Sequence, residues 1–137
     1  MRKKLVIYVD GGSRGNPGPS GVGVVILDAS GKKLKEISKY IGETTNNIAE
    51  YSALLYGLEE ALMLRVDEIV VNLDSELVAK QLTGDYRVKD SGLKPLFERA
   101  MNMLKSFKGF EIRHIEREKN KEADKLVNRA INLASLI

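Results

Sequence analysis

The chain opens with an apolar run that ends in a carboxylate and is followed at once by a glycine-rich loop. Residues 5–9 are aliphatic, β-branched or aromatic, and Asp10 is the first residue after them. Such a run, bounded by Gly and Pro, is typical of a buried central strand. Four glycines between positions 11 and 18 leave the backbone free to approach a ligand, because a residue without Cβ neither clashes nor restricts φ. The pattern predicts a strand that delivers Asp10 to a binding loop.

The same arrangement recurs in the middle of the chain. Residues 68–73 form a second apolar run that ends in Asp74 and continues directly into helix-forming sequence from Ser75. This strand-to-helix alternation predicts that the second run pairs in parallel with the first. Ligands of such sheets lie beyond the carboxyl ends of the parallel strands, and neighbouring strands are only about 5 Å apart. Asp10 and Asp74 are therefore expected to lie close together.

The remaining segments complete a mixed α/β sheet. The loop 11–20 is too short for a crossover helix, so residues 22–27 must return antiparallel, and a third strand follows over 32–41. Apolar spacing predicts helices over 46–65, from 75, over 92–106 and over 119–135, with a last strand over 110–115. We expect a five-stranded sheet whose fourth and fifth strands join parallel to the first through right-handed crossovers, with helices on both faces.

Composition limits the partners and cofactors. A chain of 137 residues suits a single domain over 1–137, and no apolar stretch has the length of a membrane span or a secretory signal. With no cysteine and one histidine, His114, any metal must be held by oxygen or by that histidine. A net charge of +3 is compatible with a nucleic-acid partner. We expect a cytoplasmic monomer with no membrane partner.

Two more acids can reach the same edge of the sheet. At 100° per residue, Glu50 lies at the margin of its helix's apolar stripe and within the first turn of that helix. Asp124 borders the apolar stripe of the last helix, again in an early turn. Helical geometry therefore allows four carboxylates to converge at one end of the sheet.

Each acid also has an ordinary structural explanation. Asp10 could begin a turn, Asp74 could cap the following helix, Glu50 could close a capping box with Asn47, and Asp124 could interact with a helix dipole. The four explanations weaken together, because like charges crowded at one edge repel and raise one another's pKa. Magnesium resolves this conflict with oxygen ligands, and paired-metal phosphodiester hydrolysis is a reaction class that needs such a cluster.

Four motifs in this order resemble those of type 1 ribonuclease H. They are Tyr8-Val9-Asp10-Gly11-Gly12-Ser13 with Asn16-Pro17-Gly18, Thr44-Thr45-Asn46-Asn47-Ile48-Ala49-Glu50, Leu73-Asp74-Ser75, and Arg117-Glu118-Lys119-Asn120-Lys121-Glu122-Ala123-Asp124. The resemblance covers essentially the whole chain. It implies the ribonuclease H-like fold with strand order 3-2-1-4-5. It also implies magnesium-dependent endonucleolytic cleavage of RNA in RNA/DNA hybrids, leaving 5′-phosphate and 3′-hydroxyl ends.

The resemblance also implies roles for individual residues. The four acids match the family's metal-binding carboxylates, with Asp10 bridging two Mg²⁺ ions in the substrate complex and Mn²⁺ able to substitute. Residues that match contacts to the RNA strand, where the 2′-hydroxyl distinguishes RNA from DNA, are Gly12, Ser13, Asn16 and Asn47. Thr45 matches a residue that binds a DNA-strand phosphate. Glu76 stands where a glutamine often meets RNA, and Lys89 is expected to grip phosphates together with Lys94.

The chain also departs from the family pattern. Glu43, Glu76 and Asp90 stand where an arginine, a glutamine and an asparagine are common, which affects substrate contacts rather than chemistry. Segment 84–89 is too short for the basic protrusion of many bacterial members, so the chain looks closer to a compact, archaeal-like branch. Two alternatives remain open. One is a nucleic-acid-binding relative without catalysis, which would gain phosphate affinity by losing its acids. The other is a nuclease that also cuts double-stranded RNA.

The loop before the last helix lacks the histidine that assists catalysis in many bacterial members. His114 falls in the last strand, where the backbone holds it rigidly, so we expect a structural role for it. Arg117 lies in the loop and can offer a forked pair of donors to a phosphate near the metals. The alternative for Arg117 is a surface ion pair with Glu116 or Glu118, which contributes at most about 1 kcal/mol.

Overall fold

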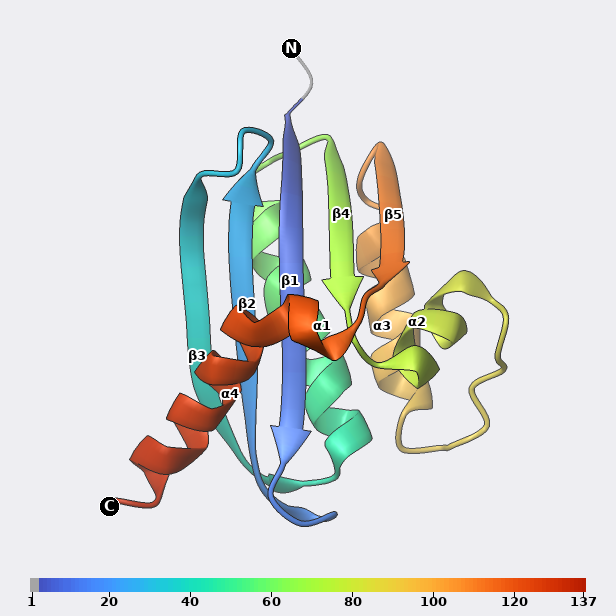
Figure 1. The fold of residues 1–137 in the computed structure, drawn as a ribbon. Helices are drawn as coiled ribbons and strands as arrows, with labels where there is room; N and C mark the ends of the chain where they lie inside the picture. The colour runs from blue at the N-terminus through green and yellow to red at the C-terminus, as the bar shows by residue number, and fades with distance from the viewer. Residues whose placement is uncertain (1–2) are drawn as a thin grey trace.

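The computed structural model describes residues 3–137 and contains one five-stranded sheet with the order β3-β2-β1-β4-β5 (Figure 1). Strand β2 is antiparallel to β1 and β3, whereas β4 is parallel to β1 and β5. The strand order and directions expected from the sequence are confirmed. In chain order the elements are β1 (Lys4–Ser13), β2 (Gly18–Asp28), β3 (Lys33–Thr44), α1 (Asn46–Met63), β4 (Glu68–Leu73), α2 (Glu76–Thr83), α3 (Lys94–Leu104), β5 (Gly109–His114), the 3-10 helix η1 (Arg117–Asn120) and α4 (Lys121–Ala134).

The main core lies between the sheet and α1 with α3, which stand behind the sheet in Figure 1. Alternate residues of β1 supply one side of this core, because successive side chains of a strand point to opposite faces. Leu5, Ile7 and Val9 are buried there. Helix α1 contributes residues at helical spacing, among them Leu54 and Leu58, which are also buried. The apolar run at the start of the chain is therefore a central strand, as expected.

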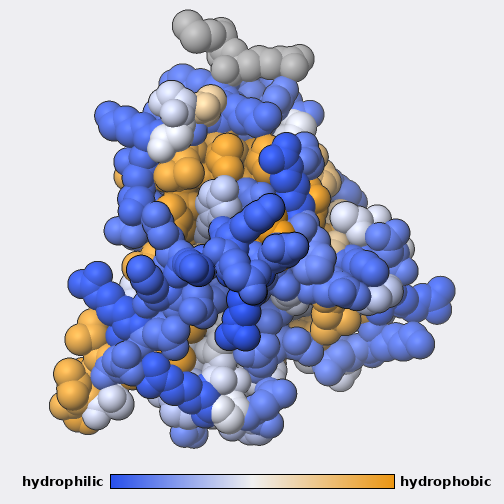
Figure 2. Space-filling view, in the orientation of Figure 1, coloured by the Kyte–Doolittle hydropathy of each residue, from blue (hydrophilic) through white to orange (hydrophobic). Residues whose placement is uncertain are grey.

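Helix α4 lies alone on the opposite face of the sheet (Figure 1). Its buried stripe includes Leu126, Val127 and Ile131, which pack towards β1, β2 and β3. Above α4, Figure 2 shows apolar surface on this face, rimmed by hydrophilic side chains. Helices thus cover both faces, but unevenly. Within residues 3–137, no helix is long and apolar enough to cross a membrane.

Several boundaries differ from those expected. Strand β1 continues to Ser13 and β2 already begins at Gly18, so most of the segment expected to be a loop is paired strand. Glycine keeps both backbone hydrogen-bonding groups, so the glycine-rich sequence continues the ladder instead of ending it. Helix α3 begins at Lys94, two residues later than expected, with Pro95 in its first turn. The last helix is preceded by η1, and α4 itself begins at Lys121.

Two glycines let helices approach the sheet unusually closely beside Asp10. A Cβ on Gly11 would lie 2.1 Å from the carbonyl oxygen of Ala49 in α1. A Cβ on Gly23, which pairs with Asp10 across the strands, would lie 2.1 Å from the carbonyl oxygen of Ala123 in α4. Contacts this short exclude any side chain at either position. The first turns of α1 and α4 are therefore held against opposite faces of the sheet at the level of Asp10.

Candidate active site

The four acids line one polar cavity of about 390 Å³ at the carboxyl ends of β1 and β4. Asp10 comes from β1 and Asp74 directly follows β4, while Glu50 and Asp124 come from α1 and α4 on opposite faces. The convergence expected from the sequence is thus present in the fold.

Local hydrogen bonding removes three of the ordinary explanations for these acids. The N-cap of α1 is Thr45, whose hydroxyl accepts from a backbone N–H at 3.3 Å, so Glu50 is free of any capping box with Asn47. The N-cap of α2 is Ser75, which accepts from a backbone N–H at 3.2 Å, so Asp74 does not cap that helix. Asp10 lies inside β1 and begins no turn.

Burial and mutual repulsion perturb two of the carboxyl groups. The pKa of Asp10 is raised to about 8, mainly by burial and then by the nearby charges of Asp74 and Asp124. The pKa of Glu50 is also raised, again mainly by burial, although the nearby hydroxyl of Ser75 opposes the shift. Asp124 keeps its favourable place in the first turn of α4. The site therefore crowds carboxyl groups whose negative charges disfavour one another.

The donor atoms of the cavity fit a hard divalent cation that brings its own water. The Oε2 atom of Glu50 is buried without a hydrogen-bond partner within the described chain, and so is the hydroxyl of Ser13. In residues 3–137, no three Asp, Glu, His or Cys side chains stand close enough to hold one ion by themselves. Magnesium usually keeps several waters and takes only one or two carboxylates directly. An ion of that kind suits carboxylates that share a cavity without forming a closed cage.

Asparagine side chains donate hydrogen bonds to three of the four acids. Asn46 donates to Glu50 Oε1 at 2.8 Å, and Asn128 donates to Asp124 Oδ2 at 3.4 Å. The third donor is Asn120, whose Nδ2 lies 3.3 Å from Asp74 Oδ2. These donors were missed in the sequence, although the first two stand four residues from their acids on one helix, a spacing at which side chains meet.

Three other residues singled out from the sequence also line the cavity: Gly12, Ser13 and Arg117. Arg14 lines it as well and was missed, and its guanidinium donates to Asn128 Oδ1 at 3.4 Å. Among the described residues, Arg117 makes no ion pair, so the expected alternative with Glu116 or Glu118 is absent from this part of the chain.

The other expected substrate contacts lie outside the lining of this cavity: Asn16, Thr45, Asn47, Glu76 and Lys89. The carboxylate of Glu76 accepts from the Tyr86 hydroxyl at 3.2 Å and lies 3.5 Å from Lys80 Nζ. Asn16 accepts from the backbone N–H of Asn46 at 3.0 Å, which ties the glycine-rich turn to the start of α1.

His114 ends β5 and pairs with Leu73, so its expected strand position is confirmed. Its side chain is exposed, however, and it does not line the cavity. The exposure arises because β5 is an edge strand whose residues are only partly covered.

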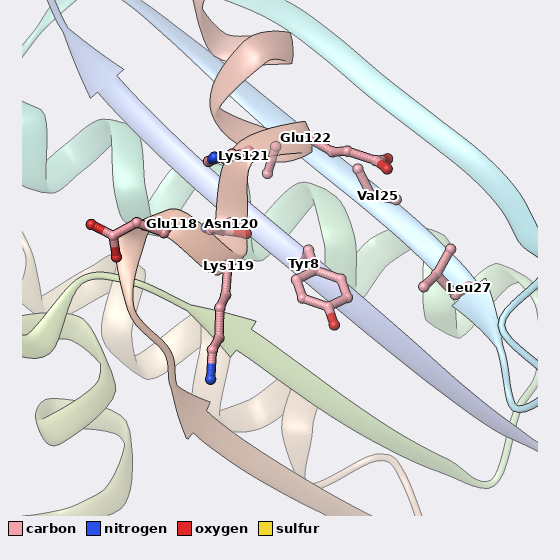
Figure 3. Close-up of a pocket in the computed structure, with 9 residues that line it drawn as sticks. Tyr8, Val25, Leu27, Glu118, Lys119, Asn120, Lys121 and Glu122 are labelled. Atoms are coloured by element: carbon pink, nitrogen blue, oxygen red, sulfur yellow. The ribbon is translucent and has the colours of Figure 1, made fainter.

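A second recess, of about 260 Å³, lies on the sheet face beside the start of α4 (Figure 3). Its apolar wall is formed by Tyr8 on β1 with Val25 and Leu27 on β2, and residues 118–123 form the rest. None of the four acids lines this recess. The recess is therefore separate from the cluster of the four acids.

The chain is similar to one protein family and to several curated proteins. A family model described as reverse transcriptase-like matches residues 8–130. Ribonuclease HI of Halobacterium salinarum is 43% identical over 125 residues, covering 91% of this chain and 63% of that protein. A bifunctional protein of Mycobacterium tuberculosis is 41% identical over 133 residues, covering 96% of this chain and 36% of that protein. The chain thus spans between about a third and two thirds of the length of these relatives.

Solved structures resemble the whole fold. The crystal structure of ribonuclease H1 from Halobacterium salinarum has a TM-score of 0.91 and 42% identity, and the match covers 94% of this chain and 98% of that one. LC11 ribonuclease H1, isolated from compost by a metagenomic approach, has been solved in complex with an RNA/DNA hybrid. That complex has a TM-score of 0.90 and 49% identity, with 95% of this chain and 98% of that chain covered.

Proposed function

This chain belongs to the type 1 ribonuclease H family, and from that membership we propose that it hydrolyses the RNA strand of RNA/DNA hybrids. The observation that carries the proposal is the convergence of Asp10, Glu50, Asp74 and Asp124 on one polar cavity. A protein that only bound nucleic acid would repel phosphates with these acids. A cation bound between these acids and a phosphate would turn that repulsion into attraction.

Family membership implies dependence on a divalent metal. The finer proposal is that the four carboxylates hold two Mg²⁺ ions when substrate is bound, with Asp10 shared between them and Mn²⁺ able to substitute. Divalent ions held by these carboxylates would supply activation of the attacking water and stabilisation of the negative charge on the leaving oxygen. The unpartnered Oε2 of Glu50 and the raised pKa of Asp10 support the proposal, because both groups gain a favourable partner when a cation enters.

The protein's own groups position the scissile phosphate. Asp10 is fixed by a paired strand, so the position of the hydrolytic centre varies little. Arg117 lines the same cavity and can donate to a phosphate oxygen. The oxygen of water joins phosphorus while the bond from phosphorus to the 3′ oxygen breaks, and that oxygen takes a proton. The products carry a 5′-phosphate and a 3′-hydroxyl.

Substrate selection is proposed to involve residues that surround the cavity. LC11 ribonuclease H1 binds an RNA/DNA hybrid, and we extend that partner to this chain. Gly12 and Ser13 line the cavity, and Asn16 and Asn47 are close in sequence to lining residues. We propose that these four residues contact the 2′-hydroxyls of the RNA strand. Beyond these, the proposed contacts are Thr45 and Lys89 to phosphates, and Glu76 to the RNA strand.

An assay of four substrates tests the proposal. The purified protein is incubated with an RNA/DNA hybrid, duplex RNA, duplex DNA and single-stranded RNA, each with Mg²⁺, Mn²⁺ or a chelator. We expect cleavage of the hybrid's RNA strand with either metal and none with the chelator. Cleavage of duplex RNA as well would broaden the activity. An intact hybrid with both metals, despite measurable hybrid binding, would favour the non-catalytic alternative.

A further inference from the structure

Asn120 is one of the few buried polar residues of the described chain, with 1% of its surface exposed. It stands where η1 ends and α4 begins, between the carboxylate cavity and the recess shown in Figure 3. Asparagine at this N-cap position usually accepts a hydrogen bond from its own helix. The side chain of Asn120 makes no such bond. Its amide group is therefore committed to a contact outside α4.

Both donor bonds of Asn120 reach other parts of the fold. Its Nδ2 donates to the carbonyl oxygen of Val9 at 2.9 Å and to Asp74 Oδ2 at 3.3 Å. Val9 directly precedes Asp10, and α4 carries Asp124 one turn after Asn120. One amide group thus connects the three backbone segments that deliver Asp10, Asp74 and Asp124.

Stability alone does not account for an asparagine at this position. The Oδ1 atom of Asn120 is buried and has no hydrogen-bond partner within the described residues. An unpartnered buried polar atom destabilises a fold, and an apolar side chain of similar size would avoid that cost. The bond to Val9 by itself would anchor the helix. The additional bond to Asp74 is the contact that points to the metal site.

The other acids show the same arrangement. Glu50 and Asp124 each accept from an asparagine amide, so three of the four carboxylates have a neutral donor on one oxygen. A neutral donor fixes the orientation of a carboxylate and leaves its charge for a cation, whereas a lysine or arginine would compete with that cation. Partners of this kind, behind the metal ligands, orient the ligands and tune the metal.

We propose that Asn120 is a positioning residue of the divalent-metal site, which orients Asp74 and fastens the start of α4 to the end of β1. The inference rests on the proposed function and makes it more specific. Asn120 touches neither metal nor substrate in this role. It acts through the carboxylates, so its loss should weaken metal binding about 10–100-fold.

Asn72 provides a matched control. It is also buried, at 4% exposure, and its Nδ2 also donates to a carbonyl of β1, that of Ile7, at 3.3 Å. Its side chain contacts none of the four acids among the hydrogen bonds of the described chain. Asn72→Ala therefore removes a comparable buried bond and should leave metal affinity unchanged.

The experiment compares wild type, Asn120→Ala and Asn72→Ala by two measurements. The first is the MgCl₂ concentration at the midpoint of the rise in melting temperature, starting from chelator-treated protein. The second is the MgCl₂ concentration that gives half-maximal hybrid cleavage. In chelator, both alanine variants should have a lower melting temperature than wild type. Only Asn120→Ala should raise both MgCl₂ midpoints, by about 10-fold or more. High MgCl₂ should restore much of its cleavage rate.

Equal midpoints for Asn120→Ala and wild type would overturn the positioning role while the proposed function stands. If wild type binds Mg²⁺ but cuts no hybrid, the proposed function fails, and the melting midpoints still decide the role of Asn120. Should Asn120→Ala not fold, Asn120→Ser takes its place. Serine removes the amide that donates to Asp74 and keeps a polar side chain suited to an N-cap, so its midpoints are expected to shift in the same direction.

Discussion

Asp10 and Asp74 occupy equivalent positions on two neighbouring parallel segments. Val9 of β1 pairs with Leu73 of β4, and Asp10 and Asp74 are the residues that directly follow this pair. Adjacent strands lie about 5 Å apart, so backbone pairing fixes the spacing of the residues that carry the two carboxyl groups. Repulsion between them cannot be relieved by moving either strand. This fixed pair is the basis of the first two predictions.

Asp10→Asn should abolish cleavage with either Mg²⁺ or Mn²⁺. Asp10 is the acid that both proposed ions would share, so the loss should exceed the roughly 10–100-fold that follows removal of an outer partner. Hybrid binding should remain measurable, because the surrounding contacts are unchanged. Steady-state cleavage and a binding titration check the prediction. Asp85→Asn, an exposed acid in the turn after α2, serves as the control, and near-normal turnover of Asp10→Asn would refute the assignment.

The metal-free protein should lose stability as pH rises towards 8. The pKa of Asp10 is about 8 in the fold against an ordinary value of 3.8, so the folded state holds this proton more tightly than the unfolded chain. The corresponding stability is fully present below about pH 4 and is lost as pH rises through about 8. Melting curves in chelator at several pH values, for wild type and Asp10→Asn, test this.

Comparing Asp10→Asn with wild type isolates the contribution of Asp10, because all other titrating groups are the same in both proteins. Asp10→Asn should match or exceed the melting temperature of wild type in chelator, and its advantage should grow between pH 5 and pH 8.5. Added Mg²⁺ should remove that advantage by stabilising wild type alone. A loss of several degrees for the metal-free variant at pH 8.5 would instead indicate that Asp10 is a structural residue.

Arg117→Ala should lower the rate of cleavage about 10-fold or more, because it removes a charge-assisted phosphate contact of about 1.5–3 kcal/mol. Arg117 is exposed and lines the cavity, so the substitution should change the melting temperature little. His114→Ala is the matched control, since His114 is also exposed but does not line the cavity. A large fall in rate for His114→Ala beside a silent Arg117→Ala would reverse the two assignments.

Lys89→Ala with Lys94→Ala should weaken hybrid binding and make its salt dependence shallower. Both lysines are exposed and precede or begin α3. Each lost phosphate contact lowers the log–log salt slope, by about 0.9 on B-form DNA. Lys32→Ala with Lys105→Ala makes the same charge change at other exposed positions and should leave the slope unchanged. Equal slopes for the two double variants would show that the gripping surface lies elsewhere.

Gly11→Ala should destabilise the fold far more than Gly12→Ala, although the two glycines are adjacent. A Cβ at position 11 would meet backbone atoms of α1 at 2.1 Å, whereas one at position 12 would meet its nearest atom at 3.6 Å. Overpacking of this kind costs about 1–3 kcal/mol and sometimes more. Chemical denaturation of both variants measures the difference. Similar unfolding free energies would mean that α1 can withdraw from the sheet without cost.

The sheet and its four acids could be predicted because period-two burial and helical spacing are local signals. Asp10 and Asp74 follow apolar runs, and the directions of those runs put both acids at one edge. The extent of the strands could not be predicted in the same way. Gly11 and Gly12 suggested a loop, whereas their backbone groups continue the β1–β2 ladder, because glycine leaves both hydrogen-bonding groups available.

The hydrogen-bond partners of the acids were harder to predict. Asn46 could have been found from its spacing to Glu50 on α1, but Asn120 meets Asp74 across 46 residues of sequence. The contact between Tyr86 and Glu76 depends on a turn at Gly84, which has a φ of 88° and sends the chain back over α2. Such contacts follow from the tertiary path of the backbone, which no local pattern specifies.

The four carboxylates stand at positions 10, 50, 74 and 124, on segments that meet only when the sheet is complete. A ribosome releases a chain from its N-terminus, so α4 with Asp124 emerges after the other three acids. Until α4 has packed onto the sheet, no more than three of the four acids can share the cavity. Packing of the last helix is therefore also the step that completes the proposed metal site, so Mg²⁺ affinity should report whether α4 is docked.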